Sequence, residues 1–327
     1  MSKILCTGGC GFVGLHMVEF LLAKGHQIRA LDIHKCKEIM SREGIEFVQC
    51  DITQRQELND IFTDVDYAFH IAALFDYSAS WEQLHRVNVI GSRNLCEVAL
   101  NSNIKRIVVW SSGSVYGIPK KTPVGEDIPP KPLNNYEKSK LEQERVFLDC
   151  YNENDLPVTI IRPAAIYGPR GKYGVSQMLL MLAEGKLPGI PGPGKYKPAL
   201  VHVKDIINAA YFLHDKENSI GEIYNIGDEG KYTMEELLLA AAEILDIKIR
   251  RFHIPVSLLN LYALIHTSYS KIRKKKPRLV KDLIRYVTYD SVLNSSKIKH
   301  LGYNLLYPDT IMGLKETIDW YKEVGWV

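Results

Sequence analysis

The chain has 327 residues, of which 46% are hydrophobic and 24% are charged. These fractions exclude a disordered or collagen-like chain and are typical of a globular protein of one or two domains. The net charge of +3 does not indicate a nucleic-acid partner. No apolar run reaches the roughly 18 residues that a membrane span needs, and the first strand starts too close to Met1 for a signal peptide.

All six cysteines lie in the N-terminal half, without a CxxC pair. This distribution indicates reduced, buried cysteines rather than a disulfide framework or a zinc site. We therefore expect a cytoplasmic protein with no metal ion and no nucleic-acid partner.

The stretch 3–14, KILCTGGCGFVG, predicts a strand, a tight turn and a helix start. Gly8, Gly11 and Gly14 follow an apolar run, and Phe12 and Val13 begin an apolar pattern with helical period. One glycine would allow the turn, one would admit a pyrophosphate, and one would let the helix pack on the strand. A mobile glycine turn is the alternative, but the sequence context favours a phosphate site at a helix N-terminus.

An acidic residue, Asp32, follows Gly14 by 18 positions and ends a second apolar run, where it would bind a ribose diol. This carboxylate predicts NAD rather than NADP, because it would repel a 2′-phosphate; Lys35, which could pair with that phosphate, favours the opposite choice. After a third strand, Asp51 could accept from an adenine amino group and Ile52 could pack on the ring. Asp51 could instead cap the helix that it precedes.

The strand near 66–73 ends in His70, Ile71, Ala72 and Ala73. The small alanines would leave room above the carboxyl end of the sheet, where ligands bind in such folds. We interpret His70 as a hydrogen-bonded scaffold residue, because apolar strand residues flank it and no acidic residue lies at a useful spacing.

Strands and helices alternate through the first half of the chain, with a long helix expected over 81–100 and a short one near 54–62. This order predicts an α/β fold: a Rossmann-like, doubly wound parallel sheet with a smaller, mostly helical C-terminal substrate domain. We expect the NAD-binding domain at 1–170, with 200–228 returning to its sheet through VHVKD (201–205) and a strand at 223–226. The substrate-binding domain would comprise 171–199 and 229–327.

Tyr136 and Lys140 are four residues apart, so on a helix they share a face. An ammonium about 4 Å from a phenol, at an effective dielectric of about 20, contributes roughly 4 kcal/mol, or about three pKa units. Lys140 would thus bring the Tyr136 pKa near neutrality, where a general base works best. Ser112, which lies just after the strand expected at 106–110, would orient a substrate oxygen. The Tyr-x-x-x-Lys pattern alone is usually a solvated helix face.

Together these motifs resemble the extended branch of the short-chain dehydrogenase/reductase superfamily over essentially the whole chain. The matching segments are TGGCGFVG (7–14), Asp32, DI (51–52), HIAA (70–73), NVIGSRN (88–94), SSGSVYG (111–117), YEKSK (136–140), RPAAIYGP (162–169), HVKD (202–205) and YNIG (224–227). The resemblance implies that Tyr136 is the catalytic base, that Lys140 holds the nicotinamide ribose, and that Ser112 is the catalytic hydroxyl. It also implies an NAD site that includes Pro163, and a homodimer.

The substrate class divides the family. UDP-sugar epimerases typically have an Asn in an RYFNxYGP segment and an Arg before HVxD, whereas this chain has Ala164 and Ala165 in the first place and 197–199 (KPA) in the second. The segment resembles the 3β-hydroxysteroid dehydrogenase and dihydroflavonol reductase-like group. We therefore expect an NAD(P)-dependent oxidoreductase that interconverts a secondary alcohol and a ketone, on an apolar, sterol-, isoprenoid- or flavonoid-like substrate. A nucleotide-sugar epimerase or dehydratase is the alternative, and a non-catalytic redox sensor is a third reading.

The segment 254–285 combines a strongly apolar run with eight positive charges at 271–285, against one acidic residue, Asp282. Such a segment suits peripheral contact with an anionic membrane surface. A solvated basic turn beside a packed helix is the simpler alternative.

Overall fold

A computed structural model describes residues 2–273 and 279–327. The chain divides into two compact units. The first comprises Met1–Val115, Pro130–Pro163 and Ile206–Tyr224, and the second comprises Tyr116–Pro129, Ala164–Asp205 and Asn225–Val327. The expected return to the first domain at 200–228 thus corresponds to Ile206–Tyr224, and the loop 116–129 belongs to the second unit.

The first unit is built on a seven-stranded sheet with the strand order β10-β6-β5-β4-β1-β2-β3. Its strands are β1 (Lys3–Thr7), β2 (Gln27–Asp32), β3 (Ile45–Gln49), β4 (Tyr67–His70), β5 (Arg106–Trp110), β6 (Val158–Pro163) and β10 (Ile223–Ile226). Every neighbouring pair in the series β6-β5-β4-β1-β2-β3 is parallel. In the centre of the sheet, Cys6 of β1 lies between Ala30 of β2 and Phe69 of β4. The order reverses between β1 and β4, and it confirms the predicted Rossmann-like, doubly wound fold.

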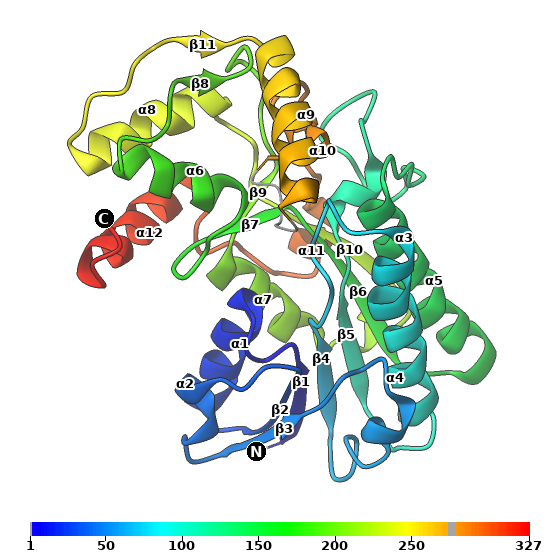
Figure 1. Ribbon diagram of the computed structural model, residues 1–327. Coiled ribbons are helices and arrows are strands. Elements are labelled where there is room, and N and C mark those ends of the chain that lie inside the picture. The colour runs from blue at the N-terminus through cyan, green and yellow to red at the C-terminus, as the bar shows by residue number, and fades with distance from the viewer. Residues whose placement is uncertain (1, 274–278) are drawn as a thin grey trace. The chain divides into compact units, whose positions relative to one another are not determined.

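Helices cover both faces of this sheet, with α1 and α7 on one side and α3, α4 and α5 on the other (Figure 1). The helices are α1 (Phe12–Ala23), α2 (Lys37–Met40), α3 (Trp81–Leu84), α4 (Gly91–Ala99), α5 (Asn135–Asn154) and α7 (Val203–Leu213). Because both faces are covered, the central strands are mostly apolar and buried; all five residues of β5 are buried, Arg106 among them.

The helix expected over 81–100 is interrupted. A π-helical turn, His85–Ile90, separates α3 from α4, and it contains the buried Asn88. The Asn88 amide bonds both backbone groups of Leu74 and donates to the Ser139 hydroxyl at 2.9 Å. The short helix expected near 54–62 is a single 3-10 turn, Arg55–Leu58.

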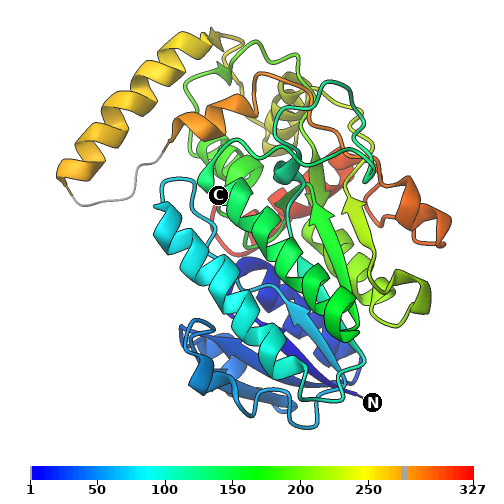
Figure 2. The same ribbon diagram turned by 90° about the vertical axis from the view of Figure 1, so that its right-hand side faces the viewer.

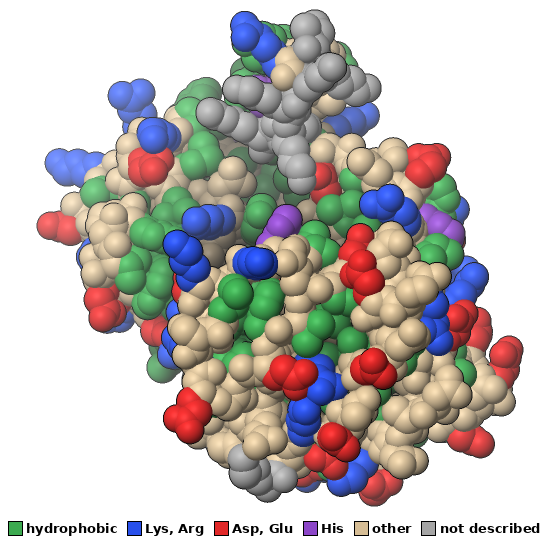
Figure 3. Space-filling model, turned by 60° about the horizontal axis from the view of Figure 1, so that its bottom comes forward, with side chains coloured by type: hydrophobic (Ala, Val, Ile, Leu, Met, Phe, Trp, Pro, Cys, Tyr) green, Lys and Arg blue, Asp and Glu red, His purple; other side chains and the backbone are tan. Residues whose placement is uncertain are grey.

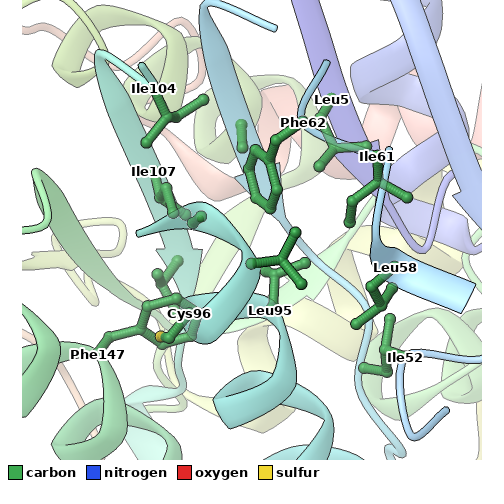
Figure 4. Close-up of a cluster of buried hydrophobic side chains, with 14 of the residues drawn as sticks. Leu5, Ile52, Leu58, Ile61, Phe62, Leu95, Cys96, Ile104, Ile107 and Phe147 are labelled. Atoms are coloured by element: carbon green, nitrogen blue, oxygen red, sulfur yellow. The ribbon is translucent and has the colours of Figure 1, made fainter. Parts of the chain in front are cut away.

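The core of the first unit lies between the sheet and the α4–α5 side. Figure 4 shows side chains from β1, β5, α4 and α5 meeting there, together with those of the 52–62 segment. Leu5, Leu95, Ile107 and Phe147 are each completely buried. Burying side chains of this size stabilises the fold by about 1.5–3 kcal/mol each, so this layer holds the strand ends in place.

The second unit has its own core and two short sheets, β7 with β9 and β8 with β11. Its elements are β7 (Ala165–Tyr167), α6 (Gly174–Ala183), β8 (Ile190–Pro191), β9 (Leu200–His202), α8 (Met234–Leu245), β11 (His253–Ile254), α9 (Val256–Ile272), α10 (Lys281–Arg285), α11 (Ser296–His300) and α12 (Thr310–Glu323). Its core joins α6, α8 and α12 through residues such as Leu179, Leu238 and Leu314.

We predicted that the chain returns to the main sheet through VHVKD (201–205). This prediction is wrong for the strand that begins the segment. Leu200–His202 pairs in parallel with Ala165–Tyr167, whereas Ile223–Ile226 joins the seven-stranded sheet as expected. The apolar pattern of this segment predicts a strand but carries no information on which of two sheets it joins.

No helix in the described residues is long and apolar enough to cross a membrane.

Candidate active site

The glycine turn after β1 has the steric roles that its sequence predicts. Gly8 has φ +72°, and a Cβ there would lie 2.9 Å from the Ala72 backbone. A Cβ on Gly14 would collide with the Gly8 carbonyl group. Gly8 therefore allows the turn beside the β4 end, and Gly14 lets α1 pack against that turn.

The N-terminus of α1 is open to an anion. Gly11 is its N-cap residue, and no side chain in the described part of the chain caps the helix or places an acidic group in its first turn. The leading amides, including those of Phe12 and Val13, therefore have no side-chain cap, and the helix dipole directs its positive end toward the site. This arrangement suits a phosphate group.

Asp32 ends β2 at the same edge of the sheet. Its carboxylate accepts from the Cys10 amide at 3.0 Å and from the His34 amide at 2.9 Å. Two backbone donors thus hold the carboxylate beside the glycine turn and leave further lone pairs for a ribose diol.

The other predicted cofactor residues also follow strand ends. Asp51 follows β3, and it accepts from the Thr53 amide at 2.9 Å instead of capping the 3-10 turn, whose N-cap is Gln54. Ile52 is only 4% exposed and packs against Gly91. Ala72 and Ala73 follow β4, and Pro163 is the last residue of β6. Their contacts with a dinucleotide remain predictions.

The three predicted catalytic residues all lie in the first unit. Tyr136 and Lys140 share the buried face of α5, and Ser112 is the second residue after β5. The helix start is fixed by the N-cap Asn134, which accepts from the Glu137 amide at 2.9 Å. Hence the phenol in the first turn and the ammonium one turn later both point into the unit.

The Tyr136 phenol does not have the lowered pKa that the sequence predicts. Burial raises its pKa well above the usual range, the nearby Tyr77 adds to this, and a hydrogen bond with Ser112 opposes it. Phe75 and Tyr77 pack on its ring, with ring centroids 5.1 and 5.0 Å away. The expected pKa near neutrality is therefore wrong for this structure, because desolvation by these rings exceeds any stabilisation of the phenolate.

Lys140 directs its ammonium elsewhere. Its Nζ donates to the Trp110 carbonyl at 2.6 Å and to the Gln143 side chain. Burial lowers the pKa of Lys140 to about 7, although the Glu144 carboxylate opposes the shift. The ammonium is thus held by neutral acceptors in a dry interior, which makes its charge easy to lose.

His70 is the scaffold residue that we expected. Its Nδ1 bonds the Thr7 hydroxyl at 2.8 Å, and its Nε2 bonds the Ser92 hydroxyl at 3.0 Å. Burial, and then the charge of Lys140, lower its pKa to about 3. A neutral His70 therefore cross-links β1, β4 and α4, and Gln143 extends this network to Lys140.

Sequence reasoning missed the buried polar layer beneath α5. Glu144 pairs with Arg162 through two bonds of 2.9 and 2.7 Å and accepts from the Ser111 hydroxyl. Gln143 and Glu144 are both essentially unexposed. The sequence did contain a signal for them. Gln143 and Glu144 lie three and four residues after Lys140, so on a helix they share its face, which was already expected to point inward.

The described residues contain no group of three or more His, Cys, Asp or Glu that could hold a metal ion. The edge of the sheet instead presents an uncapped helix N-terminus, a fixed carboxylate and a buried Tyr–Lys pair. Residues 4–227 match the model of the NAD dependent epimerase/dehydratase family. The protein belongs to that family.

Family members with several activities resemble this chain. Sterol-4-alpha-carboxylate 3-dehydrogenase, decarboxylating, of Bos taurus is 30% identical over 261 residues, covering 76% of this chain and 72% of the relative. The N-acetyl-alpha-D-glucosaminyl-diphospho-ditrans,octacis-undecaprenol 4-epimerase of Escherichia coli O157:H7 is 29% identical over 327 residues, covering 98% and 95%.

Among solved structures, the UDP-glucose 4-epimerase of Thermotoga maritima with UDP-glucose superposes with a TM-score of 0.81 at 26% identity. The match covers 98% of this chain and 99% of the epimerase. These findings confirm the predicted superfamily, an enzyme and NAD as the cofactor, and they cover dehydrogenases, decarboxylases and epimerases alike.

The residues described above fit this cofactor. The α1 N-terminus would hold the pyrophosphate and Asp32 would hold a ribose diol. Both lie at the sheet edge that also carries Ser112 and the first turn of α5.

Proposed function

We propose that this protein oxidises a secondary alcohol to a ketone, and carries out the reverse reaction, with Tyr136 as the proton-transfer group. The single observation that carries the proposal is the buried Tyr136 phenol, hydrogen-bonded to Ser112 and one helical turn from Lys140. A phenol that stays protonated at neutral pH is a competent acid for ketone reduction, and its phenolate is a strong base for alcohol oxidation.

In the oxidation, the O–H and C–H bonds of the carbinol break and a C=O bond forms. The phenolate of Tyr136 takes the hydroxyl proton, and the Ser112 hydroxyl donates to the substrate oxygen to orient it. The chemistry that bound NAD would supply is that of an acceptor for the hydride from the carbinol carbon. Lys140 contributes a cation whose position is set by Trp110 and Gln143.

We place the substrate among apolar alcohols and ketones. Ala165 occupies the place where the UDP-sugar epimerase pattern has an amide side chain, and it is exposed. A methyl group there offers no hydrogen bond to a nucleotide diphosphate. The similarity to a sterol-carboxylate dehydrogenase supports this choice.

A nucleotide-sugar or polyprenyl-linked sugar epimerase is the second candidate. The full-length similarity to the undecaprenol-linked 4-epimerase and to the Thermotoga epimerase favours it. The first half of such a reaction is the same oxidation. The difference is that the hydride returns to the substrate, so no reduced cofactor accumulates.

The test is a screen of the purified enzyme with NAD against UDP-sugars and against apolar secondary alcohols. Release of NADH with an apolar alcohol, in step with ketone formation, supports the proposal. Conversion of a UDP-sugar to its epimer without net NADH would replace it by the second candidate.

Tyr136→Phe tests the assigned chemistry. It removes the transferable proton and almost no volume, so we expect kcat to fall by about 10²- to 10⁴-fold. NAD affinity, measured by fluorescence, should stay close to that of the wild type. Tyr77→Phe is the matched control, because it removes a hydroxyl from a ring that contacts Tyr136 and should leave turnover largely intact. A wild-type rate for Tyr136→Phe would show that another group transfers the proton.

A further inference from the structure

Helix α9 of the second unit carries its large side chains on the outside. Among the side chains that the structure describes in this 17-residue helix, six apolar or aromatic ones are more than half exposed: Leu258 (53%), Leu261 (53%), Tyr262 (51%), Leu264 (66%), Ile265 (60%) and Tyr269 (53%). A surface helix normally buries such residues and exposes polar ones. Figure 2 shows α9 standing away from the other elements of its unit.

The exposed side chains form a stripe. Leu258, Leu261, Tyr262, Ile265 and Tyr269 follow the i, i+3, i+4, i+7 spacing that places residues on one helix face. The opposite side holds small residues, since Ala263 is 1% and Ser270 3% exposed. The helix thus packs on its own unit through the side that holds Ala263 and Ser270, with Leu259 and His266 half-buried, and offers most of its large apolar side chains to a partner.

The sequence around α9 is strongly basic between Asp246 and Asp282. Residues 247–281 contain ten Lys or Arg and no Asp or Glu. Lys248, Arg250 and Arg251 are exposed before the helix, and Arg273 and Lys281 are exposed after it. By contrast, acidic and basic side chains are interspersed on the face shown in Figure 3. Four of the cations in the predicted basic cluster, Lys274, Lys275, Lys276 and Arg278, lie outside the described residues.

These charges indicate what covers the apolar stripe. If a second copy of α9 packed on it in parallel, each basic flank would lie beside the same flank of the other copy. In an antiparallel pair, Arg273 and Lys281 would lie beside the Lys248–Arg251 segment. Both arrangements bring an excess of like charges together, because the sequence places only Asp246 and Asp282 beside the two flanks, and both are therefore unfavourable.

An anionic lipid surface fits both features at once. We infer that α9 lies in the headgroup region of an anionic membrane, with the Leu258–Tyr269 stripe facing the acyl chains and the flanking cations contacting lipid phosphates. Tyr262 and Tyr269 suit this depth because their rings are apolar and their hydroxyls polar. Arg273 lies 5.3 Å from the centre of the Tyr269 ring, which joins the apolar stripe to the basic flank.

This inference goes beyond the proposed function and is tested without measuring catalysis. Purified full-length protein is sedimented with vesicles of phosphatidylcholine alone, or of phosphatidylcholine with phosphatidylglycerol. We expect binding to the anionic vesicles only, and release when added salt shortens the Debye length to about 3 Å.

Two pairs of variants separate the contributions of the stripe and the flanks. Leu261→Ser with Ile265→Ser should weaken binding by at least about tenfold, because both side chains lose acyl contacts. Arg250→Gln with Arg251→Gln should weaken it by about thirtyfold, at about 1 kcal/mol per cation.

Matched controls change the same chemistry elsewhere in the second unit. Leu306→Ser with Met312→Ser removes two side chains that are 53% and 57% exposed. Lys315→Gln with Lys322→Gln removes two charges from α12, which stands apart from α9 in Figure 1. Both controls should bind vesicles as the wild type does.

Equal recovery in the supernatant with both vesicle types at low salt would overturn the inference. So would binding that the control variants weaken as much as the α9 variants do. A dimer that light scattering detects in solution and that Leu261→Ser with Ile265→Ser dissociates would assign the stripe to a second copy instead.

Discussion

Helices α1 and α9 are both rich in apolar residues, and they use them in opposite ways. In α1, Met17, Val18 and Leu21 are completely buried against the sheet. In α9, Leu261, Leu264 and Ile265 face solvent. The comparison teaches that an apolar helical pattern predicts a helix that needs a partner, but not whether the partner belongs to the same molecule.

The surroundings of the two helices differ in the same sense. Around α1 and α5, the first unit encloses polar groups as well, among them His70, Lys140 and Glu144, and satisfies them with hydrogen bonds. Around α9, both basic and apolar side chains are exposed to solvent. The first region is organised for a fixed geometry, and the second for contact with another surface.

The most damaging substitution should be Gly14→Val at the start of α1. Its Cβ would meet the Gly8 carbonyl group and would lie 2.9 Å from Gly9 Cα, so the turn and the helix must separate. We expect a loss of about 3 kcal/mol or more in the free energy of unfolding, together with loss of NAD binding. Urea denaturation and fluorescence titration measure the two effects.

Gly25→Ala is the control for Gly14→Val. Its Cβ would enter open space, although φ is +80°, and it should cost only about 1 kcal/mol. If Gly14→Val had the same urea midpoint of unfolding as the wild type, α1 would not be packed on the turn as described.

One leucine from each helix can test whether its apolar face is buried within the molecule. Leu21→Ala in α1 should lower the free energy of unfolding by about 2–5 kcal/mol, because it opens a cavity in the core. Leu261→Ala in α9 should change it by less than about 0.5 kcal/mol, because the side chain is 53% exposed. Similar losses in urea denaturation would show that α9 is covered within the molecule.

The buried charge of Lys140 should make stability depend on pH. Its folded pKa of about 7 lies below the ordinary value of 10.5, so between these values the unfolded chain binds a proton that the folded chain does not. Stability therefore rises with pH in this window. Relative to Lys140→Met, the wild type should gain about 2 kcal/mol between about pH 7 and 9.

Urea denaturation at the two pH values measures this gain. Lys281→Met, which removes an exposed ammonium at the α10 start, is the control and should run parallel to the wild type. If the free energies of unfolding of the wild type and of Lys140→Met changed equally with pH, the Lys140 ammonium of the wild type would be solvated.

The smallest expected effect concerns the cofactor. Asp32→Asn keeps an acceptor for the Cys10 amide but removes the negative charge beside the α1 turn. We expect NADH to bind about tenfold more weakly, and the preference over NADPH to shrink accordingly. Fluorescence titration with both reduced cofactors decides this. Tighter NADPH binding by the wild type would reverse the predicted preference, with Lys35 as the residue to examine next.

Much of the first unit could be predicted because each sequence signal has a local physical cause. The steric roles of Gly8 and Gly14 follow from the missing Cβ, and the shared face of Tyr136 and Lys140 follows from the helical period. The parallel sheet follows from alternating elements with apolar strands. These properties depend on neighbours in the chain or on one regular element.

Other features depend on contacts that spacing does not encode. The Lys140 ammonium bonds Trp110 and Gln143, so it does not lower the Tyr136 pKa as predicted. The strand at Leu200–His202 found its partner in β7, and not in the main sheet. In both cases the direction of a side chain or the choice of a strand partner is set by tertiary packing.

The π-helical turn at His85–Ile90 has a consequence for how this chain can change over evolutionary time. One extra residue in a helical turn rotates everything after it by about 100° about the helix axis. In this chain the rotation is fixed on both sides, by the Asn88 amide on Leu74 and Ser139 and by Leu95 and Cys96 in the core. Deleting a single residue here would turn either the amide or the core side chains outward. Length variation among descendants of this sequence should therefore accumulate in the loops and spare 81–99.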